Sequence, residues 1–220
     1  MYVGNLLSAG VRDIEVRCDQ LINGVEGGLS NIKSRFREEA LAEVGKKLTE
    51  ETLTSWLLAK RLQAAGFVTD VERPYPDSNE ECDLVLYTGD ERRFWVEVKY
   101  AWKRWFRCEG VDKANPVFKA YLLGDASHPG AAHDFRKLAR LRRPDAERVG
   151  VLLIGLDSTA KPMDPEIALL AEQEKLAAHR WELVVETHWR DRRDSSFRLN
   201  SWFWSRATPK CGALGSALEI

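Results

Sequence analysis

The sequence predicts an α/β fold in which helices cover a mixed central sheet. Segments of helical periodicity and short apolar segments follow one another in the order helix, three strands, helix, strand, helix, two strands. One apolar run, residues 148–156, is continuous and therefore suits a central strand buried on both faces. Hydrophobic residues make up 44% of the 220 positions, which is enough for a sizeable core.

This order divides the chain into three expected parts. Residues 1–48 are predicted to form a helical N-terminal extension, and residues 49–156 to form an αβββαβ core. Residues 157–220 are predicted to form a helix and a C-terminal β-hairpin that complete or flank this core.

Capping residues set the expected ends of the helices. The core is predicted to open with a helix that Thr49 caps and Gly66 ends. Asp164 is expected to cap the helix after the buried strand, with Pro165 at its first position.

Composition limits the compartment and the partners. The formal net charge is −1, so any attraction for nucleic acid must come from local basic clusters. The four cysteines lie far apart without C-x₂-C spacing, which favours reduced thiols over a zinc site. No run approaches the roughly 18 apolar residues of a membrane span, and the first residues lack the features of a signal peptide. We therefore expect a cytoplasmic protein with no membrane partner.

The segment CDLVLYTGDERRFWVEVKY, residues 82–100, is predicted to form a β-hairpin that turns about Asp90. Side chains alternate across a strand, so one face of this hairpin is wholly apolar. It consists of Leu84, Leu86, Phe94, Val96 and Val98. On the opposite face, Asp83 lies across from Glu97 at the open end of the hairpin, and Lys99 lies two residues further along.

Two opposed carboxylates require a shared proton or a cation between them. A hard divalent cation such as Mg²⁺ or Mn²⁺ takes oxygen ligands and is held by one or two carboxylates with phosphate and water. Lys99 on the same face can orient an attacking water or neutralise phosphate. We interpret Asp83, Glu97 and Lys99 as a metal-dependent phosphodiesterase site. The alternative is a solvated hairpin face, because Glu-x-Lys alone is common.

A third carboxylate, Glu51, is expected at the same end of the sheet. The first core helix climbs about 21 Å at 1.5 Å per residue, and the next strand descends a similar distance to the level of Asp83. Glu51 shares a helical stripe with Leu58 and Leu62, whereas Glu50 points about 100° away. The alternative is that both glutamates only favour the helix N-terminus.

At this point residues 49–156 resemble the PD-(D/E)XK nuclease superfamily, which has the restriction-endonuclease-like fold. The matching motifs are CDLVLY and WVEVKY, and HDFRKLARL followed by RVGVLLIGL is similar to the next helix and strand of that family. The resemblance implies that Asp83 and Glu97 bind Mg²⁺ or Mn²⁺ and that Lys99 assists the attacking water. It implies that Glu51 supports the metal or the water. Pro76 and Asp77 in "PYPD" spell the letters "PD" of the family name, but we assign Asp77 to a turn and prefer Asp83 as the site residue.

The resemblance implies a nuclease with a nucleic-acid substrate, DNA being favoured over RNA. We therefore expect a metal-dependent DNA endonuclease. The alternative is a catalytically inactive member of the same fold that binds nucleic acid or a protein.

Several basic residues are candidate nucleic-acid contacts. Lys103, Arg104 and Arg107 alternate with aromatic residues in YAWKRWFR, where cations can meet phosphates and rings can stack on bases. The alternative is a strand end with core aromatics and cations that reach solvent. Asp134 is expected to cap its helix, and Lys137 is either a phosphate contact or a solvated lysine.

The C-terminal part is rich in tryptophan, with Trp181, Trp189, Trp202 and Trp204 in or beside the last two predicted strands. Core packing or a homodimer surface explains them more simply than base stacking. The four histidines show no ligand spacing and are expected to be ordinary polar residues.

Overall fold

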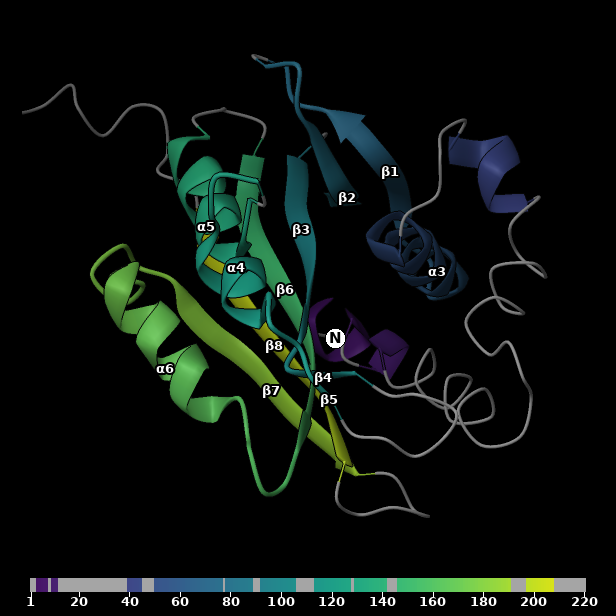
Figure 1. The fold of residues 1–220 in the computed structure, drawn as a ribbon. Coiled ribbons are helices and arrows are strands. Elements are labelled where there is room, and N and C mark those ends of the chain that lie inside the picture. Colours follow the sequence, from purple (N-terminus) through teal and green to yellow (C-terminus); the bar gives the residue numbers. More distant parts are fainter. Residues whose placement is uncertain are drawn as a thin grey trace, which may run out of the picture.

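A computed structural model describes residues 3–7, 9–11, 39–44, 50–76, 78–88, 92–105, 113–127, 129–141, 146–190 and 197–207. Within them a six-stranded mixed sheet has the strand order β1-β2-β3-β6-β8-β7 (Figure 1). Its strands are β1 (Val68–Pro74), β2 (Glu81–Thr88), β3 (Arg92–Trp102), β6 (Ala146–Ser158), β7 (Glu182–Arg190) and β8 (Phe197–Ala207). The predicted α/β class with a mixed central sheet is confirmed.

The helices of this sheet are α3 (Glu50–Ala64), α4 (Phe118–Leu123), α5 (Ala131–Arg140) and α6 (Asp164–Gln173). The predicted sequence of elements is present, with α5 as the helix between the third and fourth long strands. Two features were not predicted: the short helix α4, and a two-stranded sheet of β4 (Arg104–Trp105) and β5 (Lys113–Ala114).

The register of the sheet follows from its alternating pattern. Strands β2 and β3 pair antiparallel with Leu84 opposite Val96 and Leu86 opposite Phe94, which is the predicted register. Strand β3 then pairs in parallel with β6, and β6 pairs antiparallel with β8. Residues Val149–Gly155 of β6 are buried, as expected of a central strand.

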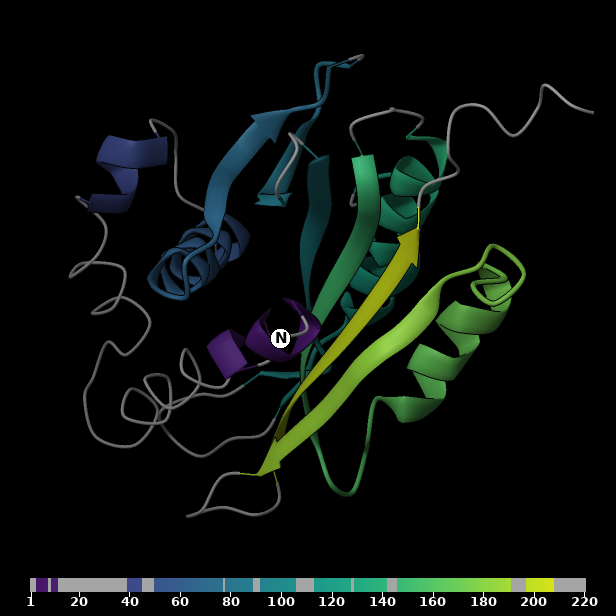
Figure 2. The same ribbon diagram turned by 180° about the vertical axis from the view of Figure 1, so that it is seen from behind.

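The two faces of the sheet carry different layers (Figures 1 and 2). Helix α3 and the helical residues 3–7 and 9–11 cover one face, where Leu58 and Leu62 join Leu7 and Val11 in a buried cluster. Helices α4, α5 and α6 cover the other face around a second buried cluster. That cluster contains Trp95, Phe135, Met163, Trp202 and Trp204. Glu97, at the open end of the β2–β3 hairpin, points to this second face, where it meets Lys137 of α5.

The described parts of residues 1–48 pack against the core. Besides residues 3–7 and 9–11, the helical residues 39–44 lie beside α3, where Trp56 Nε1 donates a hydrogen bond to Glu43 Oε2 at 2.8 Å. The predicted cap Thr49 lies outside the described residues. Gly66 ends α3 as predicted: its φ of 89° is the left-handed conformation that favours glycine.

The last two strands complete the sheet, because β8 lies between β6 and β7. Trp202 and Trp204 are buried in the core, so core packing explains them and they offer no dimer surface. The side chain of Trp189 lies outside the described part of the chain. The expected cap at Asp164 is wrong: Met163 precedes α6, and the Asp164 carboxylate instead accepts a hydrogen bond from Arg198 at 2.8 Å.

None of the described helices has the length and apolar composition required to cross a membrane. Cys82 is buried, and the other three cysteines lie outside the described residues.

Candidate active site

The candidate site lies where β2 and β3 part. Their last regular pair at the open end is Leu84 with Val96, beyond which β3 continues beside β6 as far as Trp102. Asp83 follows at the point of divergence, and its Oδ2 accepts a hydrogen bond from the backbone N–H of Val98 at 2.7 Å. This hydrogen bond gives the Val98 N–H of β3 an acceptor and holds the Asp83 carboxylate against β3.

Strand β1 is distorted at the same level. Glu72 lies between two regular β1–β2 pairs with a φ of 52°, an uncommon conformation for a residue other than glycine. Its Oε1 accepts a hydrogen bond from Thr52 Oγ1 at 3.1 Å. This bond ties β1 to the first turn of α3, which carries Glu51.

Asp83 and Glu97 lie together, as the hairpin register predicted. Burial first, and then the charge of Glu97, raises the pKa of Asp83 well above its usual value, while the hydrogen bond from Val98 opposes the shift. Burial first, and then the nearby carboxylate of Asp134, raises the pKa of Glu97, while Lys137 opposes that shift. Glu97 is only 3% exposed and Asp83 is partly buried near it, and bound cations or protons are favoured where carboxyl groups are so placed.

Two neighbouring side chains fix the position of Glu97. The Tyr75 hydroxyl donates a short hydrogen bond to Glu97 Oε1, and Lys137 Nζ lies 2.8 Å from the same oxygen. The Tyr75 ring stacks on Trp95 with 5.0 Å between ring centroids, and Lys137 Nζ lies 5.2 Å from the centroid of the Tyr75 ring. Glu97 on β3 is therefore held in position by Tyr75 from the loop after β1 and by Lys137 from α5.

Lys99 lies between two carboxylates on different elements. Its Nζ is 3.4 Å from Glu51 Oε1 on α3 and 3.7 Å from Asp134 Oδ2 on α5. Glu51 Oε1 also accepts the Tyr100 N–H at 3.5 Å. Burial alone would lower the pKa of Lys99, but Asp134 and then Glu51 raise it above its usual value. Lys99 is consequently an ammonium ion at neutral pH.

Asp134 is the acidic residue whose role sequence reasoning missed. The expected cap is wrong, because Gly130 precedes α5 and Asp134 is the fourth residue of the helix. Asp134 is only 3% exposed, and its Oδ2 has no hydrogen-bond partner. The sequence signal was its spacing of three from Lys137, which places both side chains on one face of α5. Lys137 is 16% exposed and paired with Glu97, so it is not a solvated lysine.

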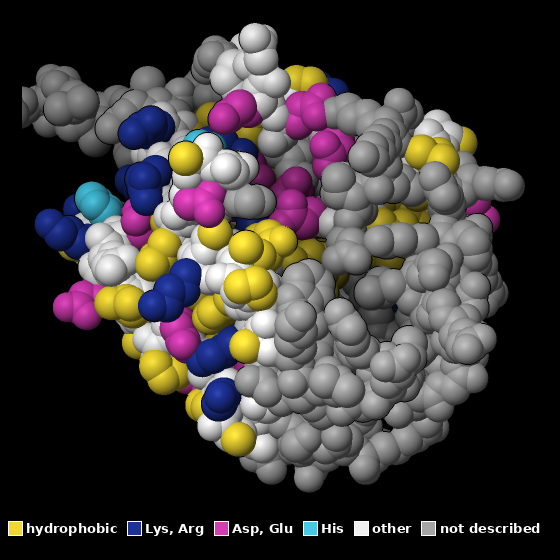
Figure 3. Space-filling model, viewed as in Figure 1, with side chains coloured by type: hydrophobic (Ala, Val, Ile, Leu, Met, Phe, Trp, Pro, Cys, Tyr) yellow, Lys and Arg dark blue, Asp and Glu magenta, His cyan; other side chains and the backbone are white. Residues whose placement is uncertain are grey.

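The charges of this cluster do not balance. Four carboxyl groups (Glu51, Asp83, Glu97 and Asp134) surround two ammonium groups (Lys99 and Lys137). With every group ionised, two negative charges remain, which is the charge that one divalent cation neutralises. On the face viewed in Figure 3, acidic side chains gather in front of β2 and β3, between α5 and α3. The donor set, all carboxylate oxygens, suits Mg²⁺ or Mn²⁺.

Of the four predicted basic contacts, Lys137 lies in this cluster, paired with Glu97, and the other three lie apart from it or outside the described side chains. Lys103 Nζ is bound to Glu166 at 2.7 Å and donates to the Pro162 carbonyl at 2.6 Å, so its charge is neutralised within the chain. Arg104 begins β4, but its side chain is not among the described ones, and Arg107 lies outside the described residues.

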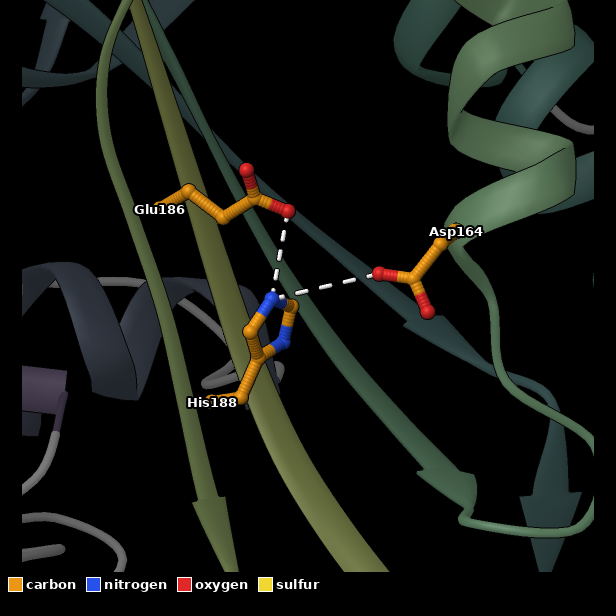
Figure 4. Close-up of side chains that lie close together, drawn as sticks. All are labelled: Asp164, Glu186 and His188. Carbon is orange, nitrogen blue, oxygen red and sulfur yellow. Dashed lines mark hydrogen bonds and ion pairs between the residues drawn. The ribbon is translucent and has the colours of Figure 1, made fainter.

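Among the described residues, one group of three potential ligands has all its ligand atoms closely spaced, and it lies at the junction of β7 and α6 (Figure 4). The carboxylates at β2 and β3 do not meet this spacing in threes. The ligand atoms of Asp164, Glu186 and His188 all lie within 4.8 Å of one another. His188 Nε2 is 3.1 Å from Glu186 Oε1 and 3.9 Å from Asp164 Oδ1. Arg198 already binds Asp164, and Trp202 Nε1 donates to Glu186 Oε1 at 2.9 Å. A cation here would compete with a guanidinium group that is already in place.

Comparison with known proteins identifies no relative. No protein-family model matches the chain, and no match is found among curated proteins or solved structures.

Proposed function

We propose that this chain is a phosphodiesterase that requires Mg²⁺ or Mn²⁺ and cleaves nucleic acid, with DNA cut internally as its main substrate. The PD-(D/E)XK resemblance and a restriction-endonuclease-like core of α3, β1, β2, β3, α5 and β6 are part of this proposal. The observation that carries it is the placement of Asp83 and Glu97 at the divergence of β2 and β3, where Asp83 accepts the Val98 N–H and the Lys99 ammonium pairs with Glu51. Excess negative charge at a site of carboxylate oxygens supports a divalent cation.

In this proposal Asp83 and Glu97 hold the metal, with Glu51 and Lys99 completing the site. A bound cation would neutralise charge on phosphate and lower the pKa of a bound water. Lys99, held by Glu51, would donate a hydrogen bond to the attacking water or to a phosphate oxygen. Tyr75 and Lys137 would keep Glu97 in position. Hydrolysis forms one bond from the water oxygen to phosphorus and breaks one bond from phosphorus to the leaving oxygen.

The class of reaction is tested with substrates that differ in form. Supercoiled plasmid, linear duplex, single-stranded DNA and RNA are incubated with Mg²⁺, with Mn²⁺ or with EDTA. Conversion of plasmid to nicked or linear product with metal, and its loss in EDTA, is the expected result. Absence of cleavage of every substrate in both metals would exclude the proposed activity.

The assignment of Lys99 is tested by Lys99→Ala. Loss of the ammonium is expected to reduce cleavage by at least about 100-fold, with Mn²⁺ binding and a folded state retained. Lys60→Ala is the matched control, since Lys60 pairs with Glu43 on the outer side of α3. An unchanged cleavage rate in Lys99→Ala would remove the catalytic role of Lys99.

A second candidate function is a non-catalytic member of the same fold that binds nucleic acid or a partner protein. It is favoured by the ion pairs that already engage Lys99, Lys103 and Lys137 within the chain. Binding of DNA that is unaffected by EDTA, with no product in either metal, would favour this function.

A further inference from the structure

Helix α5 directs two opposite charges at the strand that carries Glu97. Asp134 and Lys137 are three residues apart, so they lie on one helical face, and Asp134 is buried against β3 while Lys137 is 16% exposed. Lys137 reaches Glu97 Oε1 at 2.8 Å, but its Nζ is 4.0 Å from Asp134 Oδ1. The lysine therefore satisfies Glu97 and leaves Asp134 without a hydrogen bond from it.

Lys99 and His133, two other neighbours of Asp134, also form no hydrogen bond with it. Lys99 Nζ is 3.7 Å from Asp134 Oδ2, and His133 Nδ1 is 3.7 Å from Oδ1. Both distances exceed that of a hydrogen bond. A buried carboxylate oxygen without a hydrogen-bond partner is unfavourable, and in native proteins it indicates a strained site or a bound ion or water. The free oxygen of Asp134 faces the same cluster as Glu97.

Glu51 is engaged in a different way. One of its oxygens is 3.4 Å from Lys99 Nζ and 3.5 Å from the Tyr100 N–H, and the other is 3.4 Å from Lys99 Nζ. Both oxygens therefore face donors on β3. These contacts of Glu51 suit a residue that orients Lys99. They suit a metal ligand less well, because both carboxylate oxygens are already engaged.

We propose that Asp134 is a ligand of the divalent cation held by Asp83 and Glu97, and that Glu51 acts on Lys99 instead. This inference rests on the proposed function, since it assigns a further residue to the same site. It places the third acidic ligand on α5, the helix after the two metal-binding strands. In the absence of a cation, the Lys137 ammonium supplies positive charge between Glu97 and Asp134.

The test measures Mn²⁺ binding itself, by calorimetry and by the electron paramagnetic resonance signal of free Mn²⁺. Four variants are compared with the unaltered protein: Asp134→Asn, Glu51→Gln, Asp83→Asn and Glu182→Gln. Glu182 is the matched control, because it is exposed on edge strand β7, three strand spacings or about 14 Å from β3. Thermal unfolding of each variant in EDTA establishes that it is folded.

We expect Asp134→Asn to raise the Kd for Mn²⁺ by at least about tenfold, and Asp83→Asn to raise it further. Glu51→Gln should change the Kd less than about threefold, and Glu182→Gln should leave it unchanged. A Kd for Asp134→Asn within threefold of the unaltered protein overturns the inference. A loss in Glu51→Gln as large as that in Asp134→Asn also overturns it.

The outcomes separate this inference from the proposed function. If the unaltered protein binds no Mn²⁺, the metal-dependent activity itself is excluded. If it binds Mn²⁺ and Asp134→Asn binds equally well, the proposed function stands and only the assignment of Asp134 fails. Should Asp134→Asn not fold, Asp134→Ser removes the same charge in a smaller side chain and is judged by the same Kd criterion.

Discussion

Lys137 Nζ lies 2.8 Å from Glu97 Oε1, so a helix and the neighbouring strand are joined by a buried ion pair at the candidate site. The Lys137 ammonium group offsets negative charge beside Asp83 and Glu97, two acids whose pKa values are raised. A divalent cation bound by Glu97 would therefore have to compete with a positive charge that the chain itself provides.

Lys137→Met should have opposite effects on stability and on metal affinity. Without metal, loss of the ion pair leaves Glu97 uncompensated and should lower the free energy of unfolding by roughly 1–3 kcal/mol. With Mn²⁺, the variant should bind more tightly than the unaltered protein, because no ammonium is displaced. Thermal unfolding in EDTA and in Mn²⁺ measures both effects. Lys60→Met is the control, since its pair with Glu43 is exposed. An equal response to Mn²⁺ in variant and unaltered protein would refute the competition.

Tyr75→Phe isolates the hydrogen bond that orients Glu97. The ring and its stacking on Trp95 remain, but the hydroxyl donor to a buried carboxyl group is lost. We expect a loss of about 1.5–3 kcal/mol in the free energy of unfolding. Tyr87→Phe removes a hydroxyl of the same kind, bonded to the more exposed Asp70, and should cost less than about 1 kcal/mol. Urea unfolding of both variants gives the comparison, and equal losses would contradict it.

In EDTA, the stability that Asp83 and Glu97 contribute should fall as the pH rises above about 4. The pKa values of Asp83 and Glu97 are raised in the folded protein, chiefly by burial, so the folded state holds protons that the unfolded chain has released. Their contribution is full below the ordinary carboxyl pKa of about 4 and is lost as the pH rises through the raised values.

Urea unfolding between pH 4 and pH 8 measures this effect, with Asp83→Asn as the reference because its amide does not titrate. The unaltered protein should lose stability relative to the variant across this range in EDTA, and saturating Mn²⁺ should abolish the loss. A stability difference that is independent of pH would contradict the assignment.

Arg198→Met should be strongly destabilising, although Arg198 lies outside the candidate site. Its guanidinium binds both oxygens of the fully buried Asp157 at 2.8 and 2.7 Å, and it also binds Asp164. Leaving Asp157 buried without its cation should cost about 3–5 kcal/mol. Arg136→Met removes a bidentate pair of similar geometry with Glu174, but Arg136 is exposed, so less than about 1 kcal/mol is expected. Melting temperatures of the two variants give the comparison. Equal losses would show that burial does not determine how much each ion pair stabilises the protein.

Much of the fold followed from simple periodicity. The alternation of apolar residues in the hairpin fixed its register, and this register brought Asp83 and Glu97 together. The rise per residue of helices and strands placed Glu51 at the same end of the sheet as Asp83, and there Glu51 forms an ion pair with Lys99.

Other parts depended on contacts that no local pattern reveals. An aspartate near the start of a helix is usually a cap, so Asp134 was assigned to that role, and only the packing of α5 on β3 turns it toward Glu97. The grouping of Asp164 with Glu186 and His188 joins residues far apart in the chain. The insertion of β8 between β6 and β7 is likewise set by which strand edges remain free.

The central position of β6 has a consequence for shortening the protein. This strand pairs along one side with β3, within residues 49–156, and along its other side with β8, which follows more than 40 residues after residue 156. A fragment that stops at residue 156 would leave β6 as an edge strand. Its apolar side chains and its unpaired backbone N–H and C=O groups would be open to other molecules. Such a fragment should aggregate instead of acting as a minimal enzyme, even though it would contain every residue of the candidate site.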